Sequence, residues 1–186
     1  MSVKRIEREL ESRFARILSG LDIGFADPLF SERLRNLRGG TWMTVELTDK
    51  DCDLAQAMLP RGTAWGRGLN GEFPFEDGQF EVVVVDGEVL DVRTKETDSL
   101  IREIHRVLLP GGSLFFEMNG ALHRESDVFK LLRYGFDVVS VHRSGWWRFW
   151  RPGCDLMVCA QKKKWREHEG FVCGLQAPFS SMGRRK

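Results

Sequence analysis

Four carboxylates stand at or just beyond the ends of apolar segments that have the composition of β-strands: Asp22, Glu46, Asp86 and Glu117. Parallel strands end at the same edge of a sheet, so we expect these side chains to gather along one edge. A carboxylate there can bind a cation or remove a proton from a bound molecule. The pattern predicts an acidic ligand site; the alternative is that these are solvated acids that simply end the strands.

The segment GLDIGFADPLF, residues 20–30, combines an acid, a glycine and the start of a helix. We expect Asp27 to cap this helix and Pro28 to occupy its first position, where a missing N–H costs nothing. A dinucleotide-binding turn offers free N–H groups to a pyrophosphate, whereas Asp27 would take those donors itself and repel phosphate. The turn therefore disfavours NAD and tolerates a ligand without phosphate.

The histidines and the aromatic residues have structural interpretations. We expect His105 to be structural within a helix. His123 and His142 could act as bases, but we favour a surface position for each. The segment WWRFWRP, residues 146–152, could stack on a planar acceptor or a nucleobase, but we favour a hairpin whose tryptophans cover a sheet edge. The run KKKWRE from Lys162 is expected to be a solvated exit from a strand.

The composition is that of one soluble globular domain. Of the 186 residues, 42% are hydrophobic and 30% are charged, and the formal net charge of +1 does not favour nucleic acid or an anionic membrane. No apolar run approaches the roughly 20 residues that span a bilayer, and the start MSVKRIEREL is too charged for a secretory signal, so we expect a cytoplasmic protein. The four cysteines form no CxxC pair, which favours free thiols, and we expect no metal site.

Apolar periodicity predicts alternating helices and strands. Helices are expected at 3–20, 28–37, 48–59, 100–108 and 126–134, and strands at 21–24, 41–47, 63–66, 80–87, 113–118, 136–142 and 155–160. The unbroken run FEVVVVDG is typical of a central parallel strand that is covered on both faces. The alternation predicts an open α/β sheet in one domain, residues 1–164, followed by a C-terminal tail, residues 165–186.

Five segments, in this order, resemble the motifs of class I S-adenosylmethionine-dependent methyltransferases. They are LDIGFADPLFSERL, TVELTDKDCDLAQAML, FPFEDGQFEVVVVDGEVLD, IREIHRVLLPGGSLFF and LLRYGFDVVSVHR, collinear over residues 21–161 or so. The small type 11 methyltransferases are the most similar subgroup. The resemblance implies a single doubly wound, Rossmann-like α/β sheet of seven strands, mostly parallel with the last strand antiparallel, and helices on both faces.

The resemblance also implies S-adenosyl-L-methionine as cofactor and methyl transfer to a small-molecule or metabolite acceptor by in-line displacement. It implies that Asp22 orients the methionine end of the cofactor, Gly24 lies where the backbone passes it, and Glu46 accepts hydrogen bonds from the ribose. The complete set of implied cofactor-binding residues is Asp22, Gly24, Ala26, Glu46, Leu47, Leu69, Asn70 and Asp86. The candidate catalytic residues are Asp86 and Glu117, with Glu88 and Asp91 as further candidate bases.

The first of these motifs is degenerate. The family's turn continues with two more glycines, where this chain has Ala26 and Pro28, and Leu69 stands where an acid often holds the adenine. These departures leave open an alternative, a catalytically inactive methyltransferase-like protein that binds or regulates a partner. A nucleic-acid acceptor is disfavoured because DGEV stands where the Asn/Asp-Pro-Pro-Tyr signature would follow the fourth strand. A homodimer is compatible with the sequence.

Overall fold

The structure, a computed structural model, describes residues 3–68, 71–119, 122–143 and 156–164. Its helices are α1 (Val3–Arg13), α2 (Pro28–Arg38), α3 (Asp49–Met58), α4 (Lys95–Val107) and α5 (Glu125–Leu131), with 3-10 turns η1 (Gly87–Val89) and η2 (Leu132–Tyr134). Its strands are β1 (Ser19–Ile23), β2 (Thr41–Glu46), β3 (Ala64–Gly66), β4 (Phe80–Val85), β5 (Leu108–Met118), β6 (Phe136–Arg143) and β7 (Leu156–Lys162). The expected alternation of helices and strands is confirmed.

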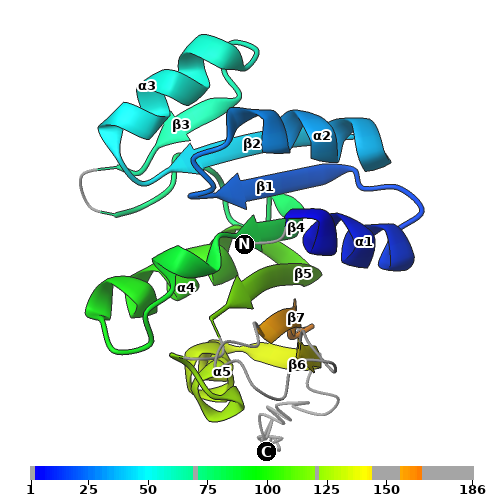
Figure 1. The fold of residues 1–186 in the computed structure, drawn as a ribbon, viewed down its shortest axis with the longest axis vertical. Helices are drawn as coiled ribbons and strands as arrows, with labels where there is room; N and C mark the ends of the chain where they lie inside the picture. The colour runs from blue at the N-terminus through cyan, green and yellow to red at the C-terminus, as the bar shows by residue number, and fades with distance from the viewer. Residues whose placement is uncertain (1–2, 69–70, 120–121, 144–155, 165–186) are drawn as a thin grey trace, which may run out of the picture.

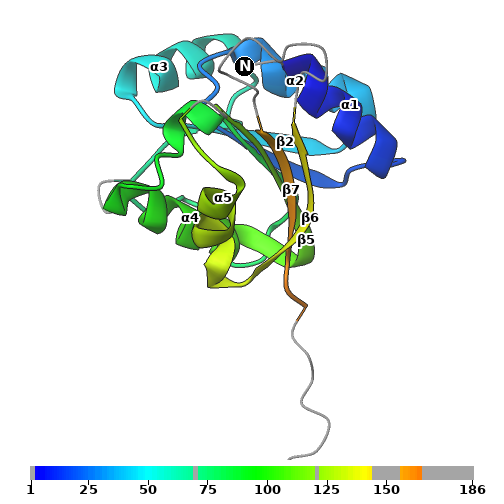
Figure 2. The ribbon, with the colours of Figure 1, turned by 60° about the horizontal axis from the view of Figure 1, so that its bottom comes forward.

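The described strands form one seven-stranded sheet in the order β3-β2-β1-β4-β5-β7-β6. Strands β1 to β5 are parallel, and β7 is antiparallel to both β5 and β6. Helices α1, α2 and α3 cover one face of the sheet, and α4 and α5 cover the other (Figures 1 and 2). The doubly wound fold with an antiparallel last strand is therefore confirmed, and its topological switch point lies between β1 and β4.

Strand β4 lies at the centre of the sheet, and its alternating residues build a core on each face. Val82 and Val84 pack in the cluster under α1 and α2, whereas Val83 and Val85 pack in the cluster under α4 and α5. Successive strand residues point to opposite faces, so an unbroken apolar run serves both clusters. All four valines are fully buried, as expected for a strand covered on both sides.

Helix α1 is shorter than the apolar spacing predicts. The helix ends at Arg13, although Ile17 continues the spacing of three or four residues. Ile17 is fully buried in the cluster under α1 and α2, but it belongs to the connection to β1. The following Leu18 N–H donates to Glu81 Oε2 at 2.9 Å. After Arg13 the chain forms a hydrogen bond to β4 instead of continuing the helix. The apolar spacing therefore indicated which residues are buried, but not where the helix ends.

Strand β5 also begins earlier than expected, because Leu108 already pairs with Phe80 of β4. The segment 110–112, expected to separate helix from strand, lies inside β5, and the register with β4 shifts between Phe80 and Val82. The Pro-Gly-Gly sequence is therefore accommodated as an irregularity of the ladder.

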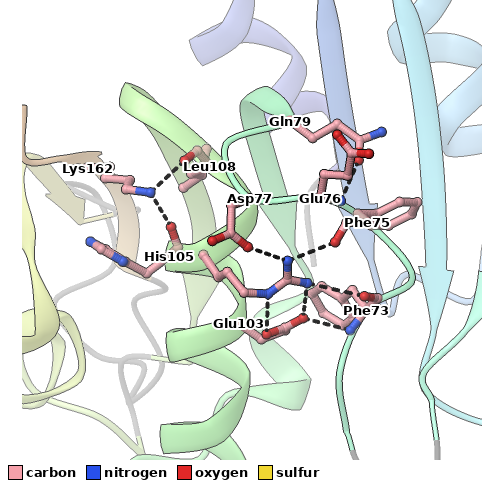
Figure 3. Close-up of polar contacts among 10 residues, drawn as sticks. Phe73, Phe75, Glu76, Asp77, Gln79, Glu103, His105, Leu108 and Lys162 are labelled. Atoms are coloured by element: carbon pink, nitrogen blue, oxygen red, sulfur yellow. Dashed lines mark hydrogen bonds and ion pairs between the residues drawn. The ribbon is translucent and has the colours of Figure 1, made fainter.

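Lys162 corrects the expectation of a solvated strand exit. It is the last residue of β7, is only 8% exposed, and its Nζ donates to the carbonyl oxygens of His105 and Leu108 at 2.7 Å each (Figure 3). The last carbonyls of a helix lack partners within the helix, and a cation is favourable at that end. Lys162 therefore caps α4, and burial lowers the pKa of its ammonium group.

Arg106 holds the loop that leads into β4, through hydrogen bonds to Phe73, Phe75 and Asp77, whose positions Figure 3 shows. Its Nη1 donates to the Phe75 carbonyl and to Asp77 Oδ1 at 2.8 Å each, and its Nη2 donates to the Phe73 carbonyl at 3.2 Å. The carboxylate of Glu103 binds the same guanidinium and accepts the Phe73 N–H at 2.7 Å. This cluster, the Glu103–Arg106 clamp, fixes the amino end of β4, at the edge of the sheet opposite the carboxyl ends of the parallel strands.

Candidate active site

The register of the sheet brings the four predicted carboxylates to one edge. Asp22 of β1 lies opposite Thr44 of β2 and Val84 of β4, and Val84 lies opposite Phe115 of β5. Glu46, Asp86 and Glu117 come two residues after Thr44, Val84 and Phe115, respectively. Because side chains alternate along a strand, all three continue on the same face as Asp22. The carboxylates act on one another electrostatically, because Asp86 raises the pKa of Glu46 and Glu117 raises the pKa of Asp86.

Close packing at Gly87 joins the ends of β4 and β5. A Cβ atom at Gly87 would lie 1.3 Å from the Glu117 carbonyl oxygen, so only glycine permits η1 to rest on the end of β5. Asp86 caps this turn by accepting the Glu88 N–H at 3.0 Å, and its own N–H donates to the Ile23 carbonyl at 3.0 Å. Burial raises the pKa of Asp86, so its charge is disfavoured at this position.

The turn after β1 keeps a bare backbone at Gly24. This residue has φ of +72°, and a Cβ there would lie 3.0 Å from Val89 Cγ1 and 3.4 Å from Leu47 Cδ1. Its N–H donates to the Val45 carbonyl at 2.9 Å, which ties the turn to β2. Both the conformation and the crowding therefore require glycine at this position.

Ala26 retains the left-handed backbone conformation in this turn, with φ of +49°. A left-handed conformation costs an L-residue roughly 1–2 kcal/mol, so the turn keeps this shape against a local penalty. Asp27 then caps α2, accepting the Leu29 N–H at 3.1 Å, and Pro28 occupies the first helical position, as predicted.

Glu46 is a buried carboxyl group with a clearly raised pKa. It is only 2% exposed, and burial raises its pKa from 4.5 to about 7, against the lowering effect of a hydrogen bond from the Ala26 N–H. The negative charges of Asp51 and Asp86 raise its pKa further. Glu46 thus changes its charge near neutral pH, and it connects the end of β2 to the turn after β1.

The other two carboxylates have polar or cationic partners. Asp22 is buried and accepts the Thr44 hydroxyl at 3.1 Å, across the β1–β2 pair. Glu117 forms an ion pair with Arg5 of α1 at 2.9 Å, and the same guanidinium donates to the His142 carbonyl at 3.0 Å. Arg5 therefore neutralises the charge of Glu117 and fastens α1 to the carboxyl edge of the sheet.

A pocket of about 400 Å³ opens beside these carboxylates, at the ends of β4 and β5. Its charged and polar lining comes from Asp86, Glu88, Asp91, Arg93, Glu117, Asn119 and His123, and its apolar lining comes from Leu90, Met118 and Leu122, with Gly87 between them. The volume is within the range typical of small-molecule sites.

His123 lines the pocket, although a surface position was favoured over its possible role as a base. It was expected at the surface and is only 9% exposed, whereas His142 is exposed as expected. The one sequence signal was its position a few residues beyond a strand-end acid, in the loop between β5 and α5. His105 is half-buried in α4, with its ring 5.2 Å from that of Phe136, in agreement with a structural role.

Some predicted site residues lie outside the described part of the chain. They are Leu69 and Asn70, expected near adenine, and the aromatic segment 146–152. The predicted tail, residues 165–186, also lies outside it. Among the described residues, no helix is long and apolar enough to cross a membrane.

The strand order and the acidic edge at the switch point define a Rossmann-like protein of the class I methyltransferase type. Residues 21–116, more than half of the chain, match the family described as "Methyltransferase domain", so the chain belongs to this family. An uncharacterized methyltransferase of Synechocystis sp. is 26% identical over 114 residues, which cover 61% of this chain but only 43% of that protein. Family membership implies S-adenosyl-L-methionine as the cofactor.

Solved structures share the fold at low sequence identity. A SAM-dependent methyltransferase of Methanosarcina mazei has a TM-score of 0.67 at 17% identity, over 84% of this chain and 97% of that one. The [4+2]-cyclase SpnF has a TM-score of 0.66 at 14% identity, over 86% of this chain and 81% of that one. The same fold therefore occurs in a protein named for another reaction, and the function has to be argued from the site.

Proposed function

We propose that this chain transfers a methyl group from S-adenosyl-L-methionine to a small-molecule acceptor by in-line displacement. The observation that carries the proposal is the acidic edge of the sheet beside a pocket of about 400 Å³, in a chain of the methyltransferase domain family. The bound cofactor supplies an electrophilic methyl group on a sulfonium. The protein contributes mainly proximity and alignment, which can gain roughly 7–11 kcal/mol in well-oriented reactions.

The residues of the β1–β2 side fit this cofactor. Carboxylates suit a ligand that carries a sulfonium and an ammonium, and Gly24 leaves the backbone bare in a turn where a Cβ would be crowded. Ala26 maintains the left-handed turn without a glycine. We assign Asp22 to the methionine end and Glu46 to the ribose hydroxyls, with Leu47 beside the turn. Leu69 and Asn70 remain sequence predictions for the adenine.

The residues of the β4–β5 side fit the acceptor. Asp86 lines the pocket and lies within electrostatic reach of Glu46, so we assign it to the border between cofactor and acceptor. We assign Glu117 to holding the pocket wall through its ion pair with Arg5. A cytoplasmic location and a homodimer remain predictions from the sequence.

Binding of S-adenosylhomocysteine, measured by isothermal titration calorimetry, tests the proposal. Hydrogen bonds to a charged group contribute about 1.5–3 kcal/mol each, so Glu46→Ala is expected to weaken binding by about ten-fold or more. Glu32→Ala, an exposed change on α2, is the matched control and should leave binding unchanged. No measurable binding to the wild-type protein would contradict the enzyme and favour the alternative of an inactive binding protein.

A further inference from the structure

Among the described residues that line the pocket, acidic side chains outnumber basic ones. Asp91 is held by Arg93 through two hydrogen bonds of 2.9 Å, and Glu117 is held by Arg5. Asp86 and Glu88 also line the pocket, and neither forms an ion pair with a cationic side chain in the described part of the chain. Among the described side chains, these two carboxylates therefore have no cationic partner, and a cation in the pocket would supply one.

His123 is a second, independent indication of a ligand. Its side chain lines the pocket, the residue is more than nine-tenths buried, and its imidazole makes no hydrogen bond to any of the described residues. Its backbone N–H donates to the Asn119 carbonyl at 3.0 Å, which holds the residue in the turn after β5. Its ring nitrogens are not sealed off from the pocket, so a ligand there can replace water as their hydrogen-bond partner.

The apolar part of the lining limits the shape of that ligand. Leu90 and Met118 are buried, and Leu122 lies exposed at the edge of the pocket. A volume of about 400 Å³ accommodates a small molecule with a short hydrocarbon portion. The pocket lining thus combines an apolar surface that can contact hydrocarbon, an excess of acidic side chains and one imidazole.

We propose that the methyl acceptor is a small primary amine that enters as its ammonium ion, that Asp86 and Glu88 bind this ammonium, and that His123 removes its proton. This inference rests on the proposed methyl transfer and specifies its acceptor. The ammonium gives one proton to the imidazole of His123, and the freed lone pair forms the new nitrogen–carbon bond. The bond from that carbon to the cofactor's sulfur breaks, its electron pair stays on sulfur, and the imidazolium later releases the proton to water.

Three probes of equal length test the charge preference: n-hexylammonium, 1-hexanol and hexanoate. Calorimetry in the presence of S-adenosylhomocysteine is expected to show n-hexylammonium binding at least about ten-fold more tightly than hexanoate, with 1-hexanol between them. The double variant Asp86→Asn with Glu88→Gln should lose this order. Equal or tighter binding of hexanoate, or the same preference in the double variant, would overturn the proposal.

The same titrations separate this inference from the proposed function. Binding of S-adenosylhomocysteine without a preference for n-hexylammonium would refute the amine acceptor alone. A preference for n-hexylammonium without any binding of S-adenosylhomocysteine would refute the methyl transfer and leave a binding site for a cationic amine. Circular dichroism spectra and thermal unfolding of each variant show whether the fold is retained.

The role of His123 is tested by NMR, without turnover. Its ring signals are identified by their loss in His123→Gln, and n-hexylammonium is expected to shift them while leaving those of the exposed His142 in place. His142→Gln is the matched control and should bind n-hexylammonium like the wild type. Unmoved His123 signals in a protein saturated with n-hexylammonium would exclude contact between this imidazole and the amine.

Discussion

Glu46 and Glu103 are both buried glutamates, but they lie at opposite edges of the sheet and in opposite electrostatic states. Glu46 is 2% exposed and Glu103 is 8% exposed. Burial raises the pKa of both, but hydrogen bonds from Arg106 and the Phe73 N–H outweigh it at Glu103, whose pKa is below the ordinary value. Glu46 has the Ala26 N–H and two neighbouring acids, and its pKa rises to about 7.

The difference separates a structural carboxylate, whose charge is balanced within the chain, from a candidate ligand-binding carboxylate, whose charge is not. The Glu103–Arg106 clamp supplies both charges from within the chain, so it stabilises the loop into β4 without any ligand (Figure 3). Glu46 is kept buried near other acids, where its charge is costly until a ligand donates to it. Perturbed carboxyl groups of this kind are typical of functional sites.

Breaking the clamp should have the largest effect on stability. Arg106→Ala leaves Glu103 buried without its cation and removes the bonds to the loop into β4, so we expect a loss of about 3 kcal/mol in the free energy of unfolding. Urea denaturation measures it. Arg102→Ala, at an exposed position of the same helix, is the control and should cost less than about 1 kcal/mol. Similar losses in both variants would mean that the clamp has no special role.

Removing the charge of Glu46 should have an intermediate effect that depends on pH. Its folded-state pKa of about 7 lies above the ordinary 4.5, so the folded protein binds this proton more tightly than the unfolded chain. The associated stability is present below about pH 4.5 and is lost as the pH rises through about 7. Glu46→Gln is therefore expected to be more stable than the wild type by about 2 kcal/mol near pH 8, and nearly equal to it near pH 4.

Urea denaturation at the two pH values gives this comparison, with Glu32→Gln on the surface of α2 as the control. The combination of higher stability with weaker cofactor binding would identify Glu46 as a residue retained for binding at a cost in stability. A variant that is less stable near pH 8 would show that the hydrogen bond from Ala26 outweighs the burial of the charge.

The smallest expected effect is at the turn after β1. Ala26 has φ of +49°, so Ala26→Gly should remove the left-handed penalty and raise the free energy of unfolding by about 1 kcal/mol. Ala57→Gly, at an exposed position within α3, should change it by about the same amount in the opposite direction. Thermal unfolding of the pair measures both, and a loss of stability in Ala26→Gly would mean that the turn is not strained.

Periodic patterns predicted most of the fold, because helices and strands follow the spacing of apolar residues. The run 80–85 became the central strand and Thr48 capped α3 as expected. Errors arose where the role of an apolar or charged residue depends on contacts with segments distant in the sequence. Ile17 is buried outside a helix, and Lys162 was grouped with the charged residues after it, although the carbonyls at the end of α4 bind its ammonium.

The sequence by itself determined the sheet, the acidic edge and the family, because local spacing and the order of motifs are properties of the chain. It also identified Asp22, Glu46, Asp86 and Glu117 as site candidates through their positions at strand ends. Only the tertiary structure decided which charges are balanced, since Arg5 reaches Glu117 from 112 residues away and Arg106 reaches back to the loop before β4. The same is true of His123, because burial depends on neighbours that meet only when the sheet has formed.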